Sequence, residues 1–133
     1  MEIKPFYSVG VLVFGDDRKN ARSNLNSKYF TFTKYRGETE TDSFDEIGLH
    51  LYYDSCDRLE LVEAFHPADI SFQGVRFIGQ NLDAVKLEME KLGFTWVGAD
   101  VGVDFPEAGI ALTAPTGVVQ GVSAHRKDYY IST

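Results

Sequence analysis

Apolar residues recur at helical spacing in one part of this chain. The intervals of three, four and three positions fall at Leu82, Val85, Met89 and Leu92, which places these side chains on one helix face. Asn81 can accept the free amides of a first turn, and Gly93 suits the left-handed position that ends a helix. A weaker helix follows Asp16 or Asp17 and is marked by Ala21 and Leu25. The pattern therefore predicts two helices.

Alternating patterns predict strands in both halves of the chain. "KYFTFTKY" alternates Phe30 and Phe32 with threonines, which is typical of a half-buried strand. In "IGLHLYYD" the alternate residues Ile47, Leu49, Leu51 and Tyr53 lie on one face of a second strand. "RLELVEAF" is a third strand, which follows the turn "DSCD" and forms a hairpin with the second. "FTWVG", "GIALTA" and "VVQGVSAH" repeat this arrangement later. The polar face of the sheet is predicted to carry Thr31, Thr33, His50, Tyr52, Glu60, Thr113 and Gln120.

Two stretches share the form Gly-Val-x-x-x-Gly: "GVLVFG" at 10–15 and "GVRFIG" at 74–79. Apolar positions that follow the first stretch also match apolar positions that follow the second. The number of residues between matched positions changes only in polar or Gly- and Pro-containing stretches, as in a duplicated unit. The predicted fold is α+β, with two tandem helix-plus-antiparallel-sheet units that share one core and carry their helices on one face. We expect a single domain, 1–133, with repeats at about 9–65 and 73–125 and a link at 66–72.

Charge narrows the classes of partner. The 133 residues carry a net charge of −7, which disfavours nucleic acid and anionic membranes and favours a basic protein partner. Cys56 is the only cysteine, so no internal disulfide is possible. The first residues lack the pattern of a signal peptide, and no apolar run reaches the roughly 20 residues of a membrane span. The sequence predicts a cytoplasmic protein that is a monomer or a dimer.

Candidate chemistry is sparse. The glycine pairs lack the Lys-Ser/Thr of a phosphate loop, and the three histidines are not at metal-ligand spacing. Asp100, Asp104 and Glu107 offer too few oxygens for a calcium loop. A pairing of His50 with Cys56 across a hairpin is the weak alternative of a nucleophilic site. We therefore predict no enzyme activity, no catalytic residue, no cofactor and no metal.

The stretch "ETETDSFDE", residues 38–46, holds five carboxylates without a basic residue. Loops often carry function, so this stretch is the predicted contact for a Lys- and Arg-rich surface, with tyrosines as anchors. The predicted partner-binding residues are Tyr35, Glu38, Glu40, Asp42, Asp45, Glu46 and Tyr52.

Three successive segments, "GVLVFGDDRKNARSNL", "FTKYRGETETDSFDEIGLHLYYD" and "RLELVEAFHPADISFQGVRFIG", resemble small bacterial immunity proteins of polymorphic toxin systems. The predicted duplicated architecture is similar to the tandem-repeat β-lactamase-inhibitory protein and to BamE-like units. The first resemblance implies a cytoplasmic protein that binds a cognate toxin and occludes its active site.

Two other classes of function remain open. The first is a small-molecule-binding protein or an enzyme that uses the polar sheet face around His50, Tyr52 and Thr113. The second is a structural subunit that dimerises through a sheet edge.

Overall fold

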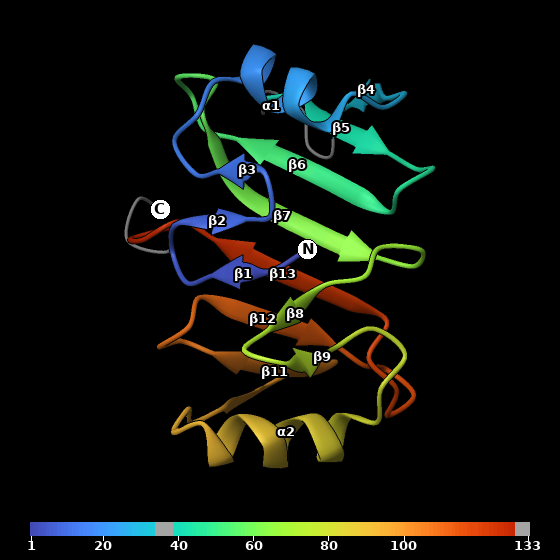
Figure 1. The fold of residues 1–133 in the computed structure, drawn as a ribbon, viewed down its shortest axis with the longest axis vertical. Helices are drawn as coiled ribbons and strands as arrows, with labels where there is room; N and C mark the ends of the chain where they lie inside the picture. Colours follow the sequence, from blue (N-terminus) through green and yellow to red (C-terminus); the bar gives the residue numbers. More distant parts are fainter. Residues whose placement is uncertain (34–38, 130–133) are drawn as a thin grey trace.

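An eight-stranded antiparallel sheet forms the centre of the computed structural model, which describes residues 1–33 and 39–129. Its strand order is β10-β11-β12-β13-β7-β6-β5-β4. The strands are β4 Phe30–Phe32, β5 Thr41–Phe44, β6 Leu49–Tyr53, β7 Leu59–Phe65, β10 Val97–Ala99, β11 Gly102–Phe105, β12 Ile110–Thr113 and β13 Gly121–His125. β7 and β13 pair in the middle, with Glu63 opposite Ser123, and join the strands of the two halves (Figure 1).

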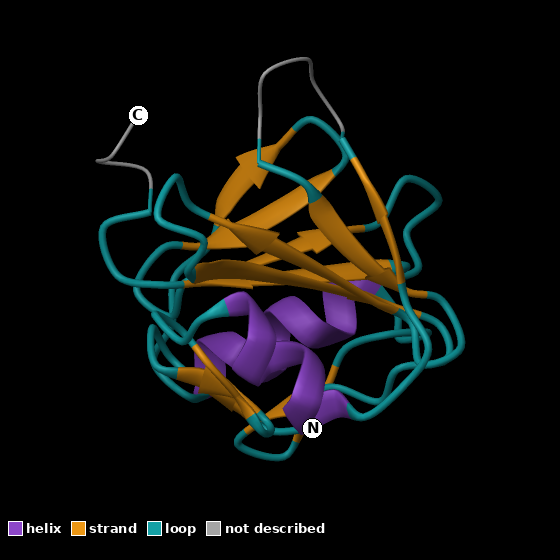
Figure 2. Cartoon of the chain, turned by 90° about the horizontal axis from the view of Figure 1, so that it is seen from above, coloured by secondary structure: helices purple, strands orange, loops and turns teal. Residues whose placement is uncertain are grey.

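Two helices and two small sheets lie on one side of the main sheet (Figure 2). The helices of the described chain are α1 Arg18–Leu25 and α2 Leu82–Lys91. The small sheets consist of β1 Ile3–Lys4, β2 Ser8–Val9 and β3 Leu12–Val13, and of β8 Ser71–Phe72 and β9 Val75–Arg76. Neither helix is long and apolar enough to cross a membrane.

The predicted fold of two tandem helix-plus-sheet units is wrong. Strands hold 42% of the described residues and helices only 15%, and both halves contribute to one continuous sheet. The prediction failed because it read polar stretches as loops. Thr41–Phe44 and Gly102–Phe105 are strands, although each contains an aspartate.

Local predictions at the helix starts are confirmed. The Asp17 side chain accepts a hydrogen bond from the Asn20 amide at 2.8 Å, and the Asn81 side chain accepts one from Ala84 at 3.1 Å. Each of the two Gly-Val-x-x-x-Gly stretches precedes a helix, and both end in the same way. The amides that end them, at Gly15 and Gly79, each donate to a carbonyl of a later segment at 2.8 Å.

The main sheet has one buried and one open face. In β6, Leu49, Leu51 and Tyr53 are buried while His50 and Tyr52 are half-buried, as the alternation predicts. In β4 the prediction that Thr31 lies on the open face is wrong. Thr31 pairs with Asp42, whose side chain is hydrogen-bonded to α1, so Thr31 lies on the helix side of the sheet. Phe32 instead joins the open face, where its ring centroid lies 5.2 Å from that of His50.

Candidate functional site

A pocket of about 290 Å³ lies beside β4, the strand at one end of the main sheet. It is lined by Lys28, Tyr29, Phe30, Ser43, Asp45 and Glu46, and we call it the edge pocket. Tyr29 and Phe30 are 42% and 53% exposed, and both carboxylates are exposed. Exposed rings beside carboxylates combine apolar contact area with negative charge, which suits a cationic protein surface.

The turn from β5 to β6 presents the two carboxylates. Ile47 donates its amide to the Phe44 carbonyl at 3.2 Å, and Gly48 donates to the Asp45 carbonyl at 3.3 Å. Gly48 ends the turn with a φ of +73°, and a Cβ there would collide with the Phe65 carbonyl oxygen. Only glycine fits this backbone. The turn therefore holds Asp45 and Glu46 at the rim of the edge pocket.

Asp42 does not reach the surface. Its side chain is fully buried and accepts hydrogen bonds from Arg18 at 3.1 Å, from two nitrogens of Arg22 at 2.8 Å each and from the Tyr53 hydroxyl at 2.8 Å. Arg18 and Arg22 lie one turn apart on α1, so both guanidinium groups meet the same carboxylate. A buried charge is tolerated when it is paired and fully hydrogen-bonded. This cluster ties α1 to the sheet.

The environment of this cluster shifts the pKa values of two of its members, Arg22 and Tyr53. The hydrogen bond to Asp42 raises the pKa of Arg22 above its ordinary value, against the opposing effect of burial. Burial, reinforced by the hydrogen bond to Asp42, raises the pKa of Tyr53 well above its ordinary value. Both groups therefore keep their protons: Arg22 remains a cation and Tyr53 a neutral donor.

Tyr29 of the edge pocket is held by this cluster. The guanidinium carbon of Arg22 lies 4.5 Å from the centroid of the Tyr29 ring, and the ring is 5.3 Å from that of Phe44. Phe44 is fully buried. The ring thus contacts both a core residue and a paired arginine, and these contacts restrict its orientation.

A chain of rings leads from the pocket across the open face of the sheet. Successive centroid distances are 6.5 Å from Phe30 to Phe32, 5.2 Å from Phe32 to His50 and 6.5 Å from His50 to Tyr52. Phe65 contacts His50 at 4.7 Å. We call these five residues the aromatic strip. Glu63 lies beside it and contacts His50 Nδ1 and the Tyr52 hydroxyl, both at 3.2 Å.

The predicted partner-binding residues separate into different places. Tyr35 and Glu38 lie outside the described residues. Glu40 is exposed, and its carbonyl accepts a hydrogen bond from Arg18 at 2.7 Å. Asp45 and Glu46 share the edge pocket, and Tyr52 belongs to the aromatic strip. Asp42 is inside the protein, so its carboxylate is unavailable to a partner.

Sequence reasoning missed the ring contribution. Tyr29, Phe30 and Phe32 are absent from the predicted site residues, although all three lie within the four residues "YFTF". The signal was present in the pattern, because a strand that alternates Phe with Thr must turn its rings to one face. Which face this is depends on the pairing with β5, which the local sequence does not specify.

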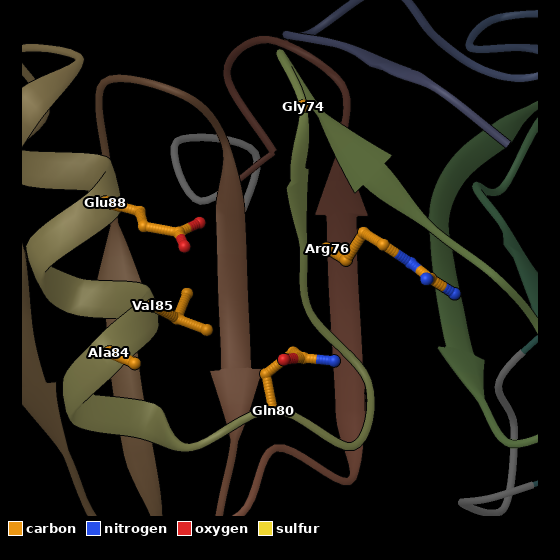
Figure 3. A pocket seen from close by; sticks show the side chains of 6 residues that line it. All are labelled: Gly74, Arg76, Gln80, Ala84, Val85 and Glu88. Carbon is orange, nitrogen blue, oxygen red and sulfur yellow. The ribbon is translucent and has the colours of Figure 1, made fainter.

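A second pocket, of about 250 Å³, lies beside α2 and is shown in Figure 3. Glu88 points from the helix towards the neighbouring strands, whereas Arg76 points away from it (Figure 3). Arg76 contacts Asp69 at 3.2 Å instead. The polar side chains that line this second pocket do not converge on one point, so the pocket is a weaker candidate site than the edge pocket. Within the described chain, no three His, Cys, Asp or Glu side chains come together as metal ligands.

Comparison with known proteins finds no family model that matches the chain, and no curated protein or solved structure that matches it. The resemblance to immunity proteins therefore stays a prediction. The geometry itself shows an exposed surface of acidic and aromatic character, formed by the edge pocket and the aromatic strip.

Proposed function

We propose that this protein is a cytoplasmic, immunity-type inhibitor that binds a basic toxin and occludes its active site. The observation that carries the proposal is the edge pocket, where the exposed carboxylates of Asp45 and Glu46 stand beside the exposed rings of Tyr29 and Phe30. Large rings and charged groups at the centre of an interface commonly supply most of its binding energy.

The charge distribution supports a basic partner. Two of the three cations of the neighbouring helix, Arg18 and Arg22, are engaged by the buried Asp42, and Lys19 is the third. Lys28 is the single basic side chain among the residues that line the pocket. With a net charge of −7 on the whole chain, a positively charged partner is attracted over a distance and its association is accelerated. Close charge pairs in such inhibitor interfaces couple by about 1.5–7 kcal/mol.

Occlusion requires no chemistry from this chain. A partner that lays basic side chains over Asp45 and Glu46 also meets Tyr29 and Phe30, and the aromatic strip extends the contact across the sheet face. Water is then excluded from the carboxylates, which strengthens the charge pairs. The inhibitor blocks its target by covering the target's catalytic groups.

The test is co-expression with the product of the neighbouring gene in the native locus. We expect this chain to protect the host from that product and to co-purify with it. The double variant Tyr29→Ala/Phe30→Ala should reduce both effects, whereas Tyr7→Ala, which removes a ring that is 60% exposed in a different part of the molecule, should not. Absence of both protection and co-purification for the unaltered chain contradicts the proposal.

A small-molecule role for the open face is a second candidate. His50 and Tyr52 both contact Glu63 at 3.2 Å, and an imidazole beside a carboxylate is suited to proton transfer. Screening of small metabolites by the NMR signals of the His50 ring tests this role. A ligand that shifts these signals, and loses affinity in His50→Ala, favours it over the inhibitor.

A further inference from the structure

The other end of the main sheet carries an unprotected edge. β10 pairs with β11 alone, with Val97 opposite Asp104 and Ala99 opposite Gly102. All three residues of β10 are exposed, and no described atom lies within 4 Å of the position that a Cβ on Gly98 would take. On such an edge, alternate backbone N–H and C=O groups point outwards without a strand to receive them.

The edge lacks the features that usually prevent strand addition. Val97, Gly98 and Ala99 include no charge and no proline, and their pairing with β11 is regular. Exposed apolar side chains gather in the same part of the sequence. Of the eleven large exposed hydrophobic residues in the described chain, five are Leu87, Leu92, Trp96, Val97 and Val101. Val97 in β10 and Trp96 directly before it thus place exposed apolar groups at an open strand edge, which is typical of an interaction surface.

Trp96 is held in place next to this edge. Its indole nitrogen donates a hydrogen bond to Glu90 at 3.1 Å, and the ammonium group of Lys86 lies 3.8 Å from the ring centroid. Both partners belong to α2. The ring is therefore fixed on the helix side of the sheet. Gly98 presents the same side, because alternate residues of a strand share a face.

We propose that a second copy of this chain adds its β10 to this edge in antiparallel orientation, with a two-fold axis at Gly98. In that register Val97 of each copy lies opposite Ala99 of the other. Trp96 lies diagonal to Gly98 of the second copy on the same face, within reach of a large ring. The ring covers the glycine that lacks a side chain, an arrangement known to stabilise glycines at sheet edges.

Charge favours a second copy over a basic partner at this edge. The adjoining helix α2 carries Asp83, Glu88 and Glu90 together with Lys86 and Lys91. Acidic and basic side chains thus lie together on a short surface, so two copies related by a two-fold axis can pair opposite charges. The edge pocket at the opposite end of the sheet has two carboxylates and one lysine. The basic partner and the second copy would use opposite ends of the same sheet, so both can bind at once.

Sedimentation equilibrium over a concentration series tests the proposal on the whole chain. We expect the mass to rise with concentration from the monomer value of 14.9 kDa to twice that value. Val97→Lys should keep the protein monomeric, because a charged lysine opposes strand addition. Val11→Lys is the matched control, since Val11 and Val97 are both 57% exposed and Val11 lies in the turn between β2 and β3, away from β10.

Trp96 provides a second measurement, because it is the only tryptophan in the chain. Its emission should shift to shorter wavelength as the dimer forms, in the unaltered chain and in Val11→Lys but not in Val97→Lys. A monomer at every concentration overturns the proposal, and so does a Val97→Lys variant that remains dimeric. If the unaltered chain is monomeric and Val97→Lys abolishes protection on co-expression, the edge belongs to the partner and not to a second copy.

Discussion

Arg22 and Asp42 are joined by two hydrogen bonds of 2.8 Å each, between a helix and a central position of the acidic stretch. This pair gives the two halves of that stretch different roles. Asp42 pairs with Arg18 and Arg22 of α1 inside the protein, whereas Asp45 and Glu46 remain exposed at the edge pocket. A run of like charges in the sequence is therefore divided by the fold into a structural part and a surface part.

Replacing Asp42 should damage the fold. In Asp42→Ala two guanidinium groups and the Tyr53 hydroxyl lose their shared acceptor, and breaking a buried ion pair by removal of one partner typically costs about 3–5 kcal/mol. Denaturant unfolding should show a loss of that size in the free energy of unfolding. Glu46→Gln, which removes an exposed charge, should change it by less than about 0.5 kcal/mol. Equal effects of the two variants would contradict the structural role of Asp42.

The sequence was most informative where structure depends on neighbours in the chain. The caps at Asp17 and Asn81 and the alternation in β6 follow from side chains within a few positions, and the structure confirms them. The burial of Asp42 could not be predicted in this way. It depends on two arginines about twenty residues earlier and on Tyr53, and carboxylates are rarely buried unless paired.

In the candidate site, too, features that depend on the local sequence could be predicted and features that depend on nonlocal pairing could not. The exposed carboxylates of Asp45 and Glu46 could be selected from charge alone, whereas Phe30 and Phe32 could not be assigned to the open face. Their orientation is fixed by the register of β4 on β5, where Phe30 lies opposite Ser43. A shift of one residue would turn both rings to the helices. Nonlocal pairing thus decides whether an aromatic strip exists.

Gly48 should tolerate no side chain. Gly48→Ala combines an unfavourable positive φ with a collision between the new methyl group and the backbone around Phe65 and Pro67. Gly117→Ala is the control, because Gly117 has a φ of +88° with open space around it, so only the conformational cost of roughly 1–2 kcal/mol applies. We expect Gly48→Ala to lose at least about 2 kcal/mol more in denaturant unfolding, as overpacking does. Similar losses in both would contradict the close backbone approach.

Asp54 should contribute to the acid sensitivity of the fold. Burial alone would raise its pKa, but hydrogen bonds from the Arg58 and Cys56 amides and from Arg126 at 2.6 Å outweigh burial and lower it. A carboxyl whose pKa is lower in the folded state stabilises the protein above its unfolded pKa of about 3.9 and loses this effect as pH falls through the folded pKa.

Asp54→Asn should therefore be less stable near neutral pH and should lose less stability on further acidification than the unaltered protein. The free energy of unfolding measured over a pH series tests this expectation. Asp83→Asn is the control, because the Asp83 side chain is 88% exposed and its ion pair with Lys86 at 3.7 Å lies on the surface, so its removal should change the curve only slightly. Parallel curves for Asp54→Asn and the unaltered protein would show that Asp54 does not contribute.

Charge reversal at the edge pocket should weaken the proposed interaction without unfolding the protein. Asp45→Lys/Glu46→Lys replaces the two exposed carboxylates, while Asp42 is left unchanged because its charge holds α1. A loss of at least about 1.5 kcal/mol corresponds to roughly a tenfold weaker affinity for the basic partner. The dependence of the affinity on salt concentration should also flatten, since fewer opposite charges meet.

The matched control for this prediction is Asp83→Lys/Glu88→Lys, which changes the net charge equally on α2, at the opposite end of the sheet (Figure 1). Titration calorimetry at several salt concentrations measures both variants, and circular dichroism verifies that each is folded. If both double variants weaken binding equally, the partner responds to net charge alone and the edge pocket is not its contact. If neither does, the interface lies elsewhere on the protein.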